Sequence, residues 1–360
     1  MLISVIFNNG YSQTEKQVQE IIKDYDMAKA NLLLQNVKQR EFLQKKEVET
    51  FAKKNNIPIF KKSGSGSFDQ LMYIAPGGIP IYYSIDNVAA ATSTRVNFLR
   101  TGGGLGLNLT GTGMVPRVWD GGPIHEHQEY AGRITMVDGT TRNDNSFHAI
   151  HVTGTVIGNG TNVNAKGMAP AATARTFDWN DDESEAITEA MNGMLLSNHS
   201  YGTPISSVST TPWYIGAYSA DAYNWDMIAY TFPNYLPVMS AGNDGGNANP
   251  SPTTNNYDKL NGNKNAKNIL TIANSNDATV NATTGAITAG GAINTSSSQG
   301  PTDDRRIKPD VAGNGTGLTS AGNGALTGGS ITQYSSLTGT SMAAPNVTGT
   351  LTLIQQHANN

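Results

Sequence analysis

Four segments of the chain carry side chains suited to acyl-transfer chemistry. Asp120 follows an apolar run and precedes two glycines, where a carboxylate can orient a neighbouring side chain, although Asp-Gly is also a common turn. His148 lies in an apolar segment that suits either a shielded general base or a core histidine. Ser341 precedes apolar residues at helical spacing, so it is either a helix N-cap or a nucleophile beside free N–H groups. Asn243 ends an apolar strand, where its amide could donate a hydrogen bond to an oxyanion.

Taken together, these segments resemble the subtilase family of serine proteases. Residues 339–345 read Gly-Thr-Ser-Met-Ala-Ala-Pro, the family's nucleophile motif around Ser341. Asp120 matches the family's strand-ending aspartate, His148 its helix-opening histidine and Asn243 its oxyanion-hole asparagine. The chain order Asp, His, Ser is also that of subtilisin. The resemblance covers residues 100–356 and extends to Gly-Pro-Thr-Asp at 300–303 and Lys-Pro-Asp-Val at 308–311.

The resemblance implies a serine endopeptidase that hydrolyses peptide bonds through an acyl-enzyme. Ser341 would attack the carbonyl, His148 would carry the proton and Asp120 would orient the imidazole. Asn243, with the Ser341 backbone N–H, would stabilise the oxyanion. Two further segments resemble the walls of the substrate cleft, and their small residues predict a roomy pocket for an apolar or aromatic side chain: Ser200, Tyr201 and Gly202 on one side, and Ser240, Ala241 and Gly242 on the other.

These residues need a scaffold that brings strand ends together. Apolar runs at residues 114–119, 149–157, 236–240 and 268–273 predict strands, and the spacing over 183–196 predicts a helix. Apolar strands alternating with helices indicate a parallel sheet covered on both faces, with reactive groups beyond the carboxyl ends of the strands. This pattern predicts an α/β fold with a mostly parallel central sheet, and the resemblance implies that it is of the subtilisin-like three-layer α/β/α type.

The chain divides into three expected regions. Residues 1–13 suggest the remnant of a signal peptide, and residues 101–360 a catalytic domain truncated at its C-terminus. Residues 14–100 predict a small α+β unit, with helix over 16–54, a turn at 63–67 and strands at 71–75 and 79–85. Residues 1–62 have a net charge of +4 and the remainder −8, so the unit could dock by charge complementarity. It resembles a pro-segment that inhibits the cleft and assists folding; a stable accessory domain is the alternative.

Composition narrows the remaining possibilities. The net charge of −4 gives no reason to expect nucleic acid or a membrane surface as partner, and the expected partners are protein or peptide substrates. The chain has no cysteine, which excludes disulfides and thiolate catalysis. We expect a secreted, extracellular bacterial protein, whereas the oligomeric state and the physiological substrate are not indicated.

Several features leave alternatives open. Ala149 and Ile150 replace the family's Gly-Thr, and Gly121 replaces a hydroxyl residue, so an inactive subtilase-like binding protein is one alternative. A metal enzyme is another, although no His-Glu-x-x-His helix is present. The expected chemistry needs no cofactor; structural Ca²⁺ is expected without assignable ligands. His151 is expected to be structural, and Asp181 and Asp182 to cap a helix. The metal alternative would draw on His125, Glu126, His127 and Glu129, or on Asp178, Asp181, Asp182, Glu183 and Glu185.

Overall fold

A computed structural model describes residues 13–62, 68–83, 91, 93–139, 145–248, 257–322 and 331–359. The expected turn at 63–67, the end of the second expected strand at 84–85 and nearly all of the expected signal-peptide remnant lie outside these residues. Within them, no helix is long and apolar enough to cross a membrane.

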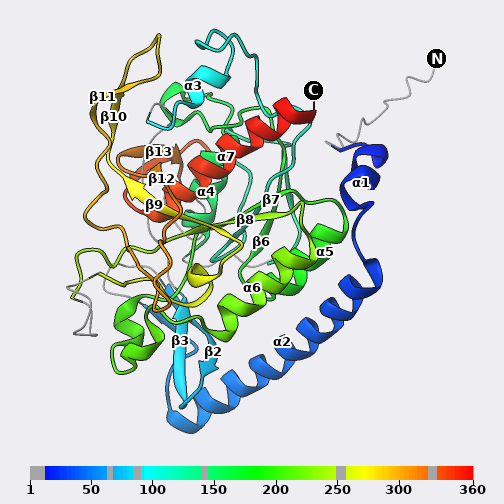
Figure 1. Cartoon of the computed structure of the whole chain (residues 1–360), viewed down its shortest axis with the longest axis vertical. Helices are drawn as coiled ribbons and strands as arrows, with labels where there is room; N and C mark the ends of the chain where they lie inside the picture. Colours follow the sequence, from blue (N-terminus) through cyan, green and yellow to red (C-terminus); the bar gives the residue numbers. More distant parts are fainter. Residues whose placement is uncertain are drawn as a thin grey trace.

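A seven-stranded parallel sheet forms the centre of the molecule (Figure 1). Its order is β12-β9-β8-β7-β4-β6-β5, and every neighbouring pair runs parallel. The α/β prediction is confirmed. The strands are β4 (Arg117–Asp120), β5 (Ile134–Met136), β6 (Ala174–Asp178), β7 (Leu196–His199), β8 (Leu236–Ser240), β9 (Leu270–Ser275) and β12 (Val311–Asn314).

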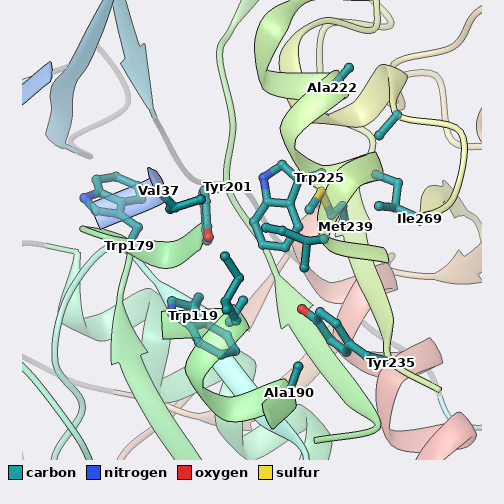
Figure 2. Close-up of a cluster of buried hydrophobic side chains, with 14 of the residues drawn as sticks. Val37, Trp119, Trp179, Ala190, Tyr201, Ala222, Trp225, Tyr235, Met239 and Ile269 are labelled. Carbon is teal, nitrogen blue, oxygen red and sulfur yellow. The ribbon is translucent and has the colours of Figure 1, made fainter. Parts of the chain in front are cut away.

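Helices cover both faces of this sheet. Helices α5 (Asp182–Met191) and α6 (Ala220–Thr231) pack on one face through a core rich in large aromatic side chains, part of which Figure 2 shows. Helices α4 (Ser146–Ile157) and α7 (Thr340–Asn359) cover the other face and contact each other. Alternation along β4 serves both layers, because Trp119 enters the first core and Val118 the second.

The N-terminal residues form a separate α+β layer outside α5 and α6 (Figure 1). Helix α1 (Glu15–Ile22) and the long helix α2 (Met27–Asn55) precede an antiparallel sheet of β1 (Phe60–Lys62), β2 (Phe68–Ala75) and β3 (Ile79–Tyr83). Asp26 caps α2 by accepting the Lys29 N–H at 2.9 Å. Because a capped helix begins at residue 27, the single helical stretch expected over 16–54 is divided in two.

This N-terminal unit shares the main core of the molecule. Its own apolar cluster has four buried residues, whereas Tyr25, Ala30, Val37 and others belong to the cluster around α5 and α6. Polar contacts extend the interface, with Arg40 paired to Glu183 and Lys45 to Asp181. The unit therefore depends on the sheet domain for much of its apolar burial.

Smaller elements complete the chain. They are the short helix α3 (Val96–Leu99), the hairpins β10 (Ala278–Val280)–β11 (Ile287–Gly290) and β13 (Leu318–Ala321)–β14 (Tyr334–Leu337), and four 3₁₀ turns (Val163–Ala165, Ile205–Val208, Pro212–Tyr214 and Gly262–Asn265).

Three local expectations were wrong. The run at 149–157 belongs to helix α4, because a segment buried on all sides has no alternation to separate helix from strand. The predicted helix over 183–196 ends at Met191, and β7 begins at Leu196. Asp181 precedes α5 without a side-chain capping bond, since its carboxylate pairs with Lys45.

Candidate active site

The register of the central sheet brings three chain segments to one edge. Trp119 of β4 pairs with His199 of β7, which in turn pairs with Met239 of β8. The next residue of each strand is therefore Asp120, Ser200 or Ser240, side by side at the carboxyl ends of neighbouring strands. Adjacent strands are about 4.8 Å apart, so these segments form one continuous floor. Such an edge is the usual site of reactive groups in a parallel sheet.

Asp120 and His148 form a buried pair on this floor. His148 Nδ1 lies 2.6 Å from Asp120 Oδ1, and the side chains are 0% and 1% exposed. The same carboxylate oxygen accepts the Gly121 N–H at 2.7 Å. Asp120 alternates with Trp119, so its side chain faces the layer that contains α4, where His148 lies. A buried carboxylate on Nδ1 fixes the tautomer whose Nε2 can accept a proton.

Packing and hydrogen bonding around β4 hold Asp120 in this position. Trp119 stacks on Phe177 with ring centroids 4.2 Å apart, and its indole N–H donates to Glu185 at 2.9 Å (Figure 2 shows Trp119 in the core). Gly121 leaves room for Asn145, because a Cβ at 121 would lie 2.7 Å from Asn145 Cβ. The departure from the family pattern at 121 is therefore a packing requirement here.

His151, one turn further along α4, has a structural position. Its Nε2 lies 3.2 Å from the carbonyl oxygens of Leu318 and Ser335 in the β13–β14 hairpin. Burial lowers the pKa of His151 to about 3, so its ring is neutral at physiological pH. A neutral imidazole donating to backbone carbonyls links the helix to the hairpin.

Ser341 is the second residue of α7 and lies beside the end of β7. Its Oγ donates to the Ser200 carbonyl oxygen at 2.9 Å, and the Ser200 hydroxyl donates back to the Ser341 carbonyl at 2.8 Å. Among the described residues, no hydrogen bond joins Ser341 Oγ to His148. Because Ser200 follows the β7 residue that pairs with Trp119, this contact brings Ser341 to the same floor as Asp120.

Asn243 is fixed by the residue that precedes Ser341. Its Oδ1 accepts the Thr340 N–H at 2.9 Å and the Thr340 hydroxyl at 3.2 Å. The Thr340 hydroxyl also accepts the Gly242 N–H at 2.9 Å. The buried Nδ2 of Asn243 has no hydrogen-bond partner within the described residues. With its oxygen anchored, the amide has a donor available beside Ser341, as an oxyanion hole requires.

The two expected walls of the substrate pocket enclose a lysine that the sequence prediction did not include. A Cβ added to Gly202 would lie 2.6 Å from Lys264 Nζ, and one added to Gly242 would lie 2.9 Å from it. Lys264 is 3% exposed. Gly242 has φ +98°, which itself favours glycine. Tyr201, by contrast, turns into the core, where its hydroxyl donates to Asp182 at 2.7 Å (Figure 2).

The side chains of the metal alternative are directed elsewhere. Among the described residues, no group of three or more His, Asp or Glu side chains is placed to hold a metal ion. His125 Nδ1 contacts the Glu126 carbonyl, and His127 Nε2 contacts the Gln333 carbonyl, each at 2.7 Å. Glu129 accepts the N–H groups of Gly160 and Asn162 at 2.7 and 2.8 Å. These side chains tie loops together.

The acidic set around α5 is also divided among separate partners. Asp181 and Glu183 pair with the N-terminal unit, and Asp182 accepts from Tyr201. Asp178 accepts the Asn180 N–H at 2.7 Å. Burial, reinforced by the charge of Asp138, raises the pKa of Glu185 to about 10, so this carboxyl is neutral at pH 7.

Sequence reasoning missed Thr340 and Lys264 as site residues. Thr340 lies inside the Gly-Thr-Ser motif, and that position alone was a signal that could have identified it. Lys264 lies in Asn-Gly-Asn-Lys-Asn at 261–265, a polar segment without periodicity that reads as an exposed turn.

Comparison with known proteins identifies the family of the chain. The model of the subtilase family matches residues 122–360. The fold is of the parallel α/β class with its candidate site at the strand ends, and the chain belongs to the subtilase family of serine peptidases.

Solved structures with detectable similarity are more distant. A cold-adapted subtilisin-like serine proteinase is 20% identical, with a TM-score of 0.44, over 75% of this chain and 86% of that one. The prenylagaramide maturation protease PagA is 18% identical, with a TM-score of 0.48, over 68% and 77%. The PatG macrocyclase domain is 14% identical, with a TM-score of 0.47, over the same shares.

Proposed function

We propose that this chain is an active serine endopeptidase in which Asp120, His148 and Ser341 form the catalytic triad and Asn243 the oxyanion hole. The observation that carries the proposal is the buried Asp120–His148 pair at the strand edge to which Ser200 tethers Ser341. Membership of the subtilase family supports the same chemistry.

The contacts suggest how each residue acts. On substrate binding, the Ser341 hydroxyl turns from the Ser200 carbonyl to His148 Nε2, which accepts its proton as the oxygen attacks the scissile carbonyl. The negative oxygen of the tetrahedral intermediate receives hydrogen bonds from Asn243 Nδ2 and the Ser341 N–H in the first turn of α7. His148 then gives the proton to the leaving amine, and water hydrolyses the acyl-enzyme.

The N-terminal unit is proposed to be a pro-segment that docks on α5 and α6. The Lys45–Asp181 ion pair across the interface and the opposite net charge of the unit support the assignment. We expect active protein to lose roughly the first hundred residues on incubation, a length taken from the predicted boundary near residue 100. A Ser341→Ala variant should stay at full mass. Full mass for both proteins would favour the accessory-domain alternative.

The direct test is labelling with a fluorophosphonate probe and mapping of the labelled peptide by mass spectrometry. A live nucleophile gives label on Ser341 alone, and the Ser341→Ala variant gives none. Ser184→Ala is the matched control, because it removes a buried hydroxyl on α5 outside the proposed site and should still be labelled.

Two other outcomes would decide against the proposal. A folded chain that is never labelled would support the inactive, subtilase-like binding protein. Hydrolysis without labelling that stops on addition of a chelator would support a metal enzyme. Secretion from a bacterial cell and binding of structural calcium stay predictions, testable by fractionation of the native producer and by calcium-dependent thermal stability.

A further inference from the structure

The walls of the substrate cleft enclose a buried positive charge. Lys264 lies in the 3₁₀ turn Gly262–Asn265, and its ammonium group reaches the backbone of both Gly202 and Gly242. Gly202 lies two residues after Ser200, which holds the Ser341 hydroxyl, and Gly242 directly precedes Asn243. Two residues span at most about 7 Å, so the ammonium is close to the reacting groups.

Both walls are adapted to the lysine. A side chain at position 202 would meet its Cε and Nζ at 2.5 and 2.6 Å, and one at position 242 would meet Nζ at 2.9 Å. A methyl group at either position would require the ammonium to move from its place between the walls. A buried ammonium requires compensation by negative charge or hydrogen bonds. One nearby negative group is Asp221, whose carboxylate accepts the Asn263 N–H at 2.9 Å and interacts electrostatically with Lys264.

The position of the charge relative to the substrate follows from the proposed mechanism. When the scissile carbonyl lies between Ser341 and Asn243, the residue that carries this carbonyl (P1) has its side chain between the two glycine walls. We propose that Lys264 makes this enzyme select peptides with a carboxylate side chain, glutamate or aspartate, at P1. The inference rests on the proposed peptidase function and replaces the apolar or aromatic preference expected from the small wall residues.

Charge and shape both support acidic selection. A carboxylate at P1 would form a charge-assisted hydrogen bond with a lysine already shielded from water, which is stronger than an exposed pair. An apolar P1 side chain would form no such hydrogen bond with the ammonium. Such a buried charge should favour acidic over uncharged P1 residues by on the order of 10²-fold or more in kcat/KM.

The test compares peptides that differ only at P1: glutamate, aspartate, glutamine, leucine and alanine. The full chain is first incubated until its mass is constant. We expect glutamate or aspartate to exceed glutamine and leucine by about 10²-fold in kcat/KM. Lys264→Met keeps length without charge and should reduce the glutamate-to-glutamine ratio to about 1, while Lys264→Arg should retain an acidic preference. Lys267→Met, in the same segment but exposed, should leave the ratio unchanged.

Each outcome separates the inference from the function on which it rests. Fluorophosphonate labelling of Ser341 and a cooperative melt establish that each variant is folded and has a live nucleophile. If the labelled enzyme cleaves glutamine, leucine or alanine peptides as well as glutamate, or if Lys264→Met keeps the acidic preference, the inference is overturned and the peptidase function stands. If the alanine peptide is cleaved fastest, Lys264 fills the pocket and does not bind a carboxylate, which also overturns the inference. Absence of labelling and of all cleavage would overturn both.

Discussion

The hydroxyl of Thr340 provides a sensitive test of the site, because it holds Asn243, the proposed oxyanion donor. It accepts the Gly242 N–H at 2.9 Å and donates to Asn243 Oδ1 at 3.2 Å. Thr340→Val keeps the β-branched shape and removes both bonds. The Thr340 N–H still holds Asn243 at 2.9 Å, so the amide loses one of two anchors.

The expected magnitudes follow from these contacts. Losing an oxyanion donor lowers turnover by about 10²–10³-fold, a value established on the asparagine of subtilisin, a member of this family. Loosening the donor should lower kcat by about 10-fold with KM changed less than about 2-fold, because the loss falls on the transition state. The Gly242 N–H left without its acceptor should reduce the free energy of unfolding by about 1–3 kcal/mol.

The assay measures kcat and KM on one peptide, together with urea unfolding, for Thr340→Val and Asn243→Ala. Thr348→Val is the matched control. Its hydroxyl, also buried on α7, contacts Asn198 Oδ1 at 3.1 Å and the Ala344 carbonyl at 3.0 Å. It should reduce stability by about 1 kcal/mol without lowering kcat. Full kcat in Thr340→Val beside a large loss in Asn243→Ala would refute the anchoring role; full kcat in both would refute the oxyanion hole.

Three further predictions concern stability, each measured by chemical unfolding. Glu189→Gln leaves the buried Arg117 guanidinium, now 2.8 Å from that carboxylate, without its charge partner and should cost about 3–5 kcal/mol. Gly154→Ala places a Cβ 2.5 Å from Ser320 Oγ, where α4 meets β13, and should cost about 1–3 kcal/mol. Burial, opposed by Arg40, raises the pKa of Glu183 from 4.5 to about 8, so the folded state holds a proton that the unfolded state releases. The contribution of this proton to the free energy of unfolding should be fully present below about pH 4.5. It should fall by at most about 5 kcal/mol as pH rises through 8.

Each of these predictions has a result that contradicts it. A loss below about 1 kcal/mol in Glu189→Gln would mean that water solvates Arg117. An unchanged free energy of unfolding in Gly154→Ala would mean that Ser320 moves aside at no energetic cost. For Glu183, the Glu183→Gln variant should show a flatter pH dependence between 5 and 9; an unchanged slope would assign the titration to another group.

Much of the site could be predicted from the sequence because its chemistry is local in the chain. The heptamer around Ser341 and the strand-ending Asp120 identify the family without any tertiary contact. The parallel sheet followed from apolar runs, and the observed register explains why the strand ends meet. The triad and the oxyanion asparagine are proposed from that combination, and the experiments above test them.

Other features could not be predicted because they depend on distant contacts. Nothing in the segment around Lys264 indicates burial between two glycines that precede it by 62 and 22 residues. Residues 149–157 are buried on every side, so their composition fits a strand as well as a helix. Asp181 has the residue type of a helix cap, but an ion pair with Lys45 from a different unit takes its carboxylate.

The position of α7 in the chain affects when the candidate site can form during synthesis on the ribosome. Helix α7 contacts α4, β7, β8, β9 and β12, and its Gln356 accepts the Thr110 and Gly111 N–H groups at 3.0 and 2.7 Å. Ser341 therefore emerges after every strand that its helix covers, and its contacts close loops of up to about 250 residues, which is slow. If Ser341 is the nucleophile, as proposed, a partly synthesised chain would hold Asp120 and His148 without it and could not cleave neighbouring nascent proteins. Proteolytic competence would arise only when α7 packs, and delaying that step should delay hydrolysis without altering the elements that precede it.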